Sequence, residues 1–133
     1  MQYIELFILG MMIGLLFELI FTACFELLTK KPLRITKKFS WGKKFSLLSL
    51  PLWGIFAIVI STQNYSIVTL FLVAGVIGTI LEAAGGYFFY RAYKSKIWVY
   101  KHGALGQFTS FYSFPYWGSM GLIFGVLAKS LGL

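Results

Sequence analysis

The sequence has no aspartate, one cysteine and one histidine, and only 12% of its 133 residues are charged. Cys24 has no second thiol in the chain, so an intramolecular disulfide is excluded. One histidine without aspartate leaves no set of ligands for a metal cluster, and we expect no cofactor. The chain also has no glycine-rich phosphate-binding motif, so any ATPase would be a separate protein. So few charges cannot solvate an ordinary globular surface.

Apolar side chains dominate instead, at 59% of the residues, and 20% are aromatic. A helix needs about 20 apolar residues to span a bilayer, and stretches of roughly that length occur at 3–28, 45–60, 67–89 and 105–127. We predict an all-α integral membrane protein with four transmembrane helices in a single domain, residues 1–133, surrounded by membrane lipid. The first stretch lacks a basic region and a small-residue cleavage site, so we expect it to be retained.

Basic residues gather in the loops at 29–45 and 91–104, whereas Lys129 is alone near the opposite end. The positive-inside rule places both loops in the cytoplasm and both termini outside, and we expect the bacterial inner membrane. This topology, with anionic lipid headgroups, accounts for the net charge of +8. Nucleic acid is therefore not an expected partner.

Residues separated by 64 positions match without gaps. Gly14 and Glu18 match Gly78 and Glu82, and SLLSLPLWG at 46–54 matches SFYSFPYWG at 110–118. Common membrane composition explains apolar matches, but not serine, proline, tryptophan and glycine in identical spacing. We predict two repeats, about 3–64 and 67–128, that each cross the membrane twice. Such repeats are parallel and related by a pseudo-twofold axis along the membrane normal.

All four acidic residues lie in predicted spans, where an ionisable group is costly unless it is paired or faces water. At about 1.5 Å rise per residue, Glu18 lies about 21 Å below Ile4 and Glu82 about 22 Å below Ile67. Each glutamate continues a stripe of small residues, which is typical of close helix packing. We expect the two carboxylates to face the interior and to hold one proton or one cation between them. Protonated packing contacts are the structural alternative.

Two proline segments lead from the basic loops into the second and fourth spans. Pro51 and Pro115, placed about two turns into these spans, predict a kink or a broken helix. Ser49 and Ser113 either satisfy the freed backbone groups or present hydroxyls to a ligand.

Two tryptophans are predicted at the depth of the glutamates, deeper than a typical interfacial belt. Their faces suit an organic cation through cation–π attraction, with core packing as the alternative. The candidate ion- or substrate-binding site consists of Glu18, Glu82, Trp53, Trp117, Ser49 and Ser113.

Three segments resemble a known family: GLLFELIFTACFE at 14–26, ILEAAGGYFFYRAYKSKIWVY at 80–100 and GQFTSFYSFPYWG at 106–118. They are similar to the ABC-transporter type IV (CmpB-like) membrane proteins and their animal transmembrane relatives. Glu18 and Glu82 fall at glutamates of the family pattern, and Trp98 and Tyr100 at the ends of its Trp-Asp-Tyr triplet. Val99 replaces the aspartate, so a role of that carboxylate does not carry over. The resemblance implies a multi-span permease.

Our leading hypothesis is a small transporter or permease, not an enzyme, in which Glu18 and Glu82 bind a proton or cation at the repeat interface. Its partners would be a small cation or an apolar substrate. The charge bias of the loops argues against an antiparallel dimer and leaves a parallel homodimer open.

Two alternatives stay open. The first is a membrane-embedded enzyme acting on a lipid or isoprenoid by glutamate acid–base chemistry. In this case the small residues at 83–86 would leave room beside Glu82 but not beside Glu18. The second is a subunit or assembly partner whose glycine stripes bind another membrane protein.

Overall fold

The computed structural model describes residues 2–37, 40–41, 45–101 and 103–132. This part of the chain is mostly helical, with α1 (Gln2–Thr29), α2 (Leu50–Ser61), α3 (Ile67–Tyr93), α4 (Ser113–Ser130) and a 3₁₀ turn η1 (Leu47–Ser49). Helices α1 and α3 are long and apolar enough to cross a membrane. With 12 residues, α2 reaches about 18 Å, which is shorter than the hydrocarbon core of about 30 Å.

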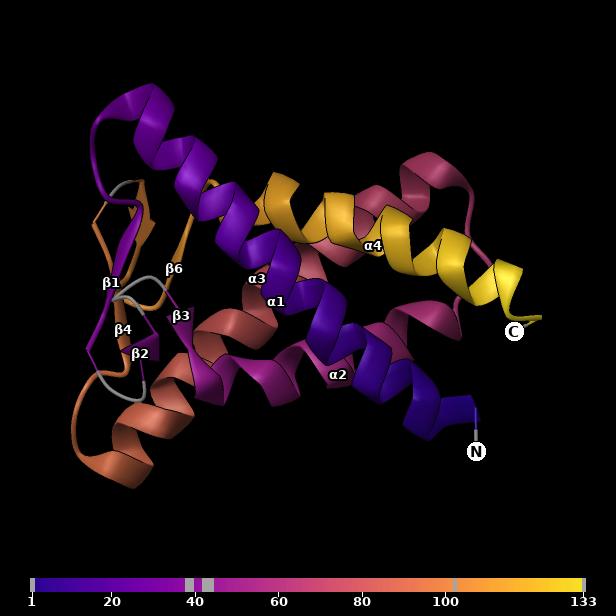
Figure 1. Ribbon diagram of the computed structural model, residues 1–133, viewed down its shortest axis with the longest axis horizontal. Coiled ribbons are helices and arrows are strands. Elements are labelled where there is room, and N and C mark those ends of the chain that lie inside the picture. The colour runs from indigo at the N-terminus through magenta and orange to yellow at the C-terminus, as the bar shows by residue number, and fades with distance from the viewer. Residues whose placement is uncertain (1, 38–39, 42–44, 102, 133) are drawn as a thin grey trace.

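Short antiparallel strands occupy the end of the molecule that carries the basic loops. The pairs are β1 (Arg34–Thr36) with β4 (Trp98–Tyr100), β2 (Ser40–Trp41) with β3 (Phe45–Ser46), and β5 (Ala104–Leu105) with β6 (Thr109–Ser110). Figure 1 shows these strands at one end and both termini at the other. The spans predicted at 45–60 and 105–127 therefore start too early, because their first residues form strands and turns.

The prolines begin helices instead of interrupting them. Pro51 occupies the first turn of α2, and Pro115 is the third residue of α4. The first N–H groups of a helix have no intrahelical acceptor, so a proline there removes no hydrogen bond. The kink or break predicted from these residues is thus corrected to two helix starts.

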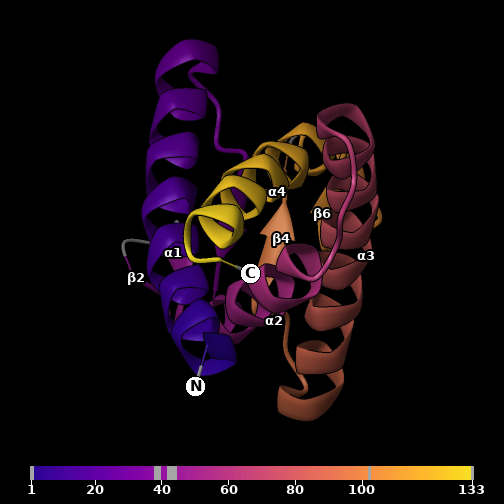
Figure 2. The ribbon, with the colours of Figure 1, turned by 90° about the vertical axis from the view of Figure 1, so that its right-hand side faces the viewer.

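The helices pack as two pairs that meet in the centre. Helix α1 packs mainly on α2 and α3 on α4, while α2 and α4 touch each other. Figure 2 shows α1 and α3 on opposite sides, with α2 and α4 between them. Both long helices turn one stripe inward and expose large apolar side chains elsewhere. Glu18 lies in the inward stripe of α1 and Glu82 in that of α3, so both carboxylates face the interior as predicted.

The glycine stripes are used inside the chain. A Cβ at Gly14 would overlap the indole of Trp53, and one at Gly78 would overlap the indole of Trp117. Gly10 lies against the backbone of α2 in the same way. At Gly14 and Gly78 the stripes thus seat tryptophans of this chain.

Candidate functional site

Three charged side chains meet in the interior. Glu18 from α1 is 2% exposed, Glu82 from α3 is 3% exposed, and Arg34 from β1 is 6% exposed. Arg34 forms an ion pair with Glu18, and its Nη1 lies 3.9 Å from Oε2 of Glu82. The two glutamates therefore lie around one guanidinium, and the chain itself supplies a cation to the pair.

Glu18 is contacted by two side chains from the segment that begins α2. Trp53 Nε1 donates to Glu18 Oε2 at 3.0 Å, and Ser49 Oγ lies 3.4 Å from the same oxygen. Ser49 also donates to the carbonyl of Ser46 at 2.7 Å, within the 3₁₀ turn that precedes α2. The serine thus bonds the local backbone and contacts the carboxylate. Presentation of its hydroxyl to a ligand stays a prediction.

Glu82 has the corresponding donors from the start of α4. Ser113 Oγ donates to Glu82 Oε1 at 2.8 Å, and Trp117 Nε1 donates to Oε2 at 3.3 Å. All six residues of the predicted site therefore lie in one cluster. The shorter serine contact and the longer distance to Arg34 distinguish the environment of Glu82 from that of Glu18.

The two tryptophans stack on each other. The ring centroids of Trp53 and Trp117 are 4.0 Å apart, with 28° between the ring planes, and Tyr116 lies edge-on to Trp53 at 5.4 Å. These contacts fill the facing surfaces of both indoles. On these surfaces the rings follow the alternative that the sequence offered, which is packing in the core. The indoles instead donate to the carboxylates and cover them.

Tyr100 is a third polar contact of the guanidinium, beside Glu18 and Glu82. Residues Arg34 and Tyr100 pair across the β1–β4 ladder, Nη1 lies 3.4 Å from the tyrosine oxygen, and the guanidinium carbon is 5.8 Å from the ring centroid. Burial raises the pKa of Tyr100, and the charge of Glu82 raises it further, so the hydroxyl stays protonated. Burial by itself lowers the pKa of Arg34. The interactions with Tyr100, Tyr116 and Glu82 outweigh this effect, so the pKa of Arg34 is raised.

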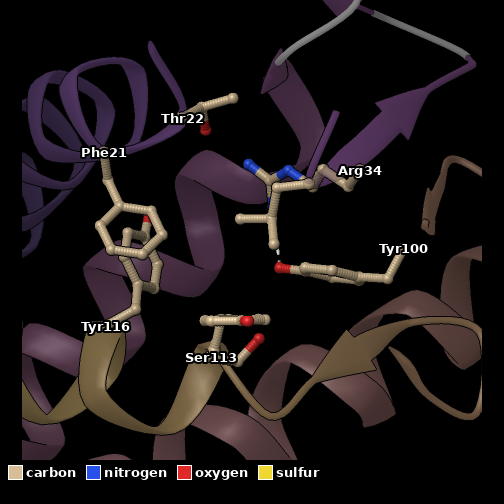
Figure 3. Close-up of a pocket in the computed structure, with 8 residues that line it drawn as sticks. Phe21, Thr22, Arg34, Tyr100, Ser113 and Tyr116 are labelled. Atoms are coloured by element: carbon tan, nitrogen blue, oxygen red, sulfur yellow. Dashed lines mark hydrogen bonds between the residues drawn. The ribbon is translucent and has the colours of Figure 1, made fainter. Parts of the chain in front are cut away.

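Two small hollows adjoin the cluster. One, of about 10 Å³, lies between Arg34, Tyr100, Tyr116 and Thr22, whose side chains converge in Figure 3. A second, also about 10 Å³, touches both glutamates and both tryptophans. Each has about the volume that one water molecule needs. Each hollow can therefore hold about one water molecule beside Arg34.

The space expected beside Glu82 is occupied. A Cβ at Gly85 would lie 2.9 Å from Leu52 Cδ1, and one at Gly86 would lie 2.6 Å from Phe108 Cβ. Gly85 and Gly86 therefore admit neighbouring side chains.

Sequence reasoning missed Arg34, because the positive-inside rule already explained every cation in its loop. A signal was present, since the chain has only two arginines among its 12 basic residues. Arginine suits buried carboxylate pairs better than lysine, because its planar fork donates to two acceptors. Arg34 also breaks the repeat, with Trp98 at the matching position.

Comparison with protein-family models found no match. No curated protein matches the chain either. The solved structures likewise contain none that matches it. The interpretation of the site therefore rests on the geometry of the cluster.

Proposed function

We propose that the chain is a small integral membrane transporter whose Glu18–Arg34–Glu82 cluster binds one proton or one small monovalent cation. The supporting observation is the charge of the cluster: two buried carboxylates lie around a single buried guanidinium. When all three groups are ionised, one negative charge is uncompensated, which is costly in a low-dielectric interior. A single proton or monovalent cation neutralises it.

Glu82 is the carboxyl that takes up the proton. Glu18 is the partner in the close ion pair, whereas Glu82 lies 3.9 Å from the nearest guanidinium nitrogen. Its closest contact is the Ser113 hydroxyl at 2.8 Å. A hydroxyl either donates to a carboxylate or accepts from a carboxylic acid, so this contact suits both protonation states.

We place α1 and α3 across the bilayer with their apolar surfaces toward lipid, and α2 and α4 between them. Helix α2 is too short to span alone, but it packs against α1, α3 and α4, and non-helical backbone is tolerated where protein covers it. The basic end faces the cytoplasm and both termini face outside, in a bacterial inner membrane. Kinship with the CmpB-like proteins is part of this proposal.

A duplicated two-helix unit with a pseudo-twofold axis is also proposed. The β1–β4 ladder supports it, because its central pair is Ile35 with Val99, two residues separated by the repeat length of 64. The ends of α1 and α3 agree as well, since Lys30 and Lys94 both have positive φ, at 58° and 54°. An axis through the ladder would pass beside Arg34, which explains how one guanidinium serves two equivalent carboxylates.

Proton flux into liposomes tests the transport proposal. We expect the reconstituted protein to acidify liposomes that contain a pH-sensitive dye when a proton gradient is imposed, with Na⁺ or K⁺ varied inside. Glu82→Gln should reduce this flux to the level of empty liposomes, because the neutral cluster then has no site for the proton. Glu5→Gln, an exposed position in the first turn of α1, is the matched control and should keep the flux.

Folding of each variant is checked by its elution volume and unfolding temperature in detergent. Equal flux through the wild type and a folded Glu82→Gln protein would exclude the cluster as the proton site. No flux above empty liposomes with the wild type under any of the cation conditions would refute transport.

A further inference from the structure

The cluster has the form of a receptor for a planar cation. Its two carboxylates come from different helices and lie around the same guanidinium. Serine and tryptophan side chains contact each carboxylate and hold it in place, as described above. The receptor is therefore built from groups other than Arg34, which only fills it.

Guanidinium fits this arrangement better than other cations. A planar cation with N–H groups along several edges can donate to two carboxylates at once, whereas an ammonium acts as a point charge. The aromatic ring of Tyr100, 5.8 Å from the guanidinium carbon, adds cation–π attraction, and its hydroxyl accepts from Nη1. A bare Ca²⁺ or Mg²⁺ ion would require more oxygen ligands in its shell than the two carboxylates and hydroxyls provide.

Arg34 reaches this position from a short strand and not from a helix. Strand β1 has three residues, and its hydrogen-bonded partner β4 also has three. Arg34 also lines two hollows of about 10 Å³ each. Arg34 is thus carried by a short two-stranded ladder and has free volume beside it. The carboxylates of Glu18 and Glu82 are carried by long helices.

We infer that the cation recognised by the Glu18–Glu82 pair is a free guanidinium-type cation, and that Arg34 is a tethered occupant which such a cation displaces. This inference rests on the proposed transport function and names its substrate class. Arg34 then keeps the site filled and neutralised when no substrate is bound. When a free guanidinium replaces that of Arg34, the charge of the cluster is unchanged. The two glutamates are therefore never left without a cation.

Chemical complementation tests the receptor. Arg34→Ala is purified with millimolar guanidinium chloride or with equal NaCl, and its unfolding temperature is followed in detergent. We expect a saturable rise of about 5 °C with guanidinium, because a ligand that binds only the folded state stabilises it. Urea, the neutral isostere, should give no rise, nor should guanidinium with the double variant Arg34→Ala/Glu18→Gln. Arg91→Ala, at the exposed second arginine, should not respond.

Uptake by the wild type tests displacement. We expect liposomes with wild-type protein to take up labelled guanidinium about tenfold faster than tetramethylammonium, which carries the same charge without N–H donors. If Arg34→Ala does not fold or is not stabilised in guanidinium, the inference is overturned. Stabilisation without uptake by the wild type also overturns it, because the position is then purely structural. Neither result decides the transport proposal, because the proton-flux measurement tests that proposal independently.

Discussion

Replacing Arg34 with methionine is expected to lower the free energy of unfolding by about 3–5 kcal/mol, since it breaks a buried ion pair. The side chain is 6% exposed, is paired with Glu18 and lies 3.9 Å from Glu82. Methionine keeps much of the volume but leaves two carboxylates in the interior without a cation. Denaturant unfolding in detergent, followed by tryptophan fluorescence, measures the loss.

Two further variants separate charge from packing. The triple variant Glu18→Gln/Arg34→Met/Glu82→Gln should regain most of the lost stability, because no buried charge remains. Arg91→Met, at an exposed position of α3, should change stability by no more than about 0.5 kcal/mol. A loss below about 1 kcal/mol for Arg34→Met, or a triple variant no more stable than the single one, would contradict the ion-pair description.

Truncating Trp53 to alanine is expected to cost about 3–5 kcal/mol, the range for a large buried aromatic side chain. Trp53 is 1% exposed, stacks on Trp117 at 4.0 Å and donates to Glu18 at 3.0 Å. Alanine would leave a cavity against Gly14 and remove the donor at the same time.

The variant Trp53→Phe separates the contribution of the aromatic ring to stability from that of the indole N–H donor. Phenylalanine keeps much of the stacking but cannot donate to Glu18, so its cost should be about 1.5–3 kcal/mol, that of a hydrogen bond to a charged group. Phe111→Ala, 67% exposed, is the control for loss of an aromatic ring and should stay within about 0.5 kcal/mol. Equal costs for Trp53→Ala and Phe111→Ala would rule out a central role of the tryptophan stack.

Long apolar runs predicted the two long helices well. The expected spans at 3–28 and 67–89 correspond to Gln2–Thr29 and Ile67–Tyr93, because nothing within these runs competes with helix. The starts of α2 and α4 were missed, since residues such as Phe45 are apolar in a short strand as well as in a helix. Apolar composition does not distinguish the two over a few residues.

The residues of the site were predictable from the repeat, but their common cation was not. Glu18 and Ser49 were selected because they recur as Glu82 and Ser113 at one spacing. Arg34 does not recur, and it reaches the glutamates only through the β1–β4 ladder, a contact between segments 64 residues apart. Such long-range pairing leaves no periodic signal in the sequence. The stacking of the tryptophans was missed for the same reason.

Infrared spectroscopy of the protonated carboxyl group tests the central claim most directly. If the cluster carries one proton, the wild type in lipid at neutral pH should show a single carboxylic C=O band. The band should persist in the Arg91→Met control and vanish in Glu82→Gln, where Arg34 and Glu18 balance each other. Absence of the band in the wild type, or its persistence in Glu82→Gln, would contradict a single proton held on Glu82.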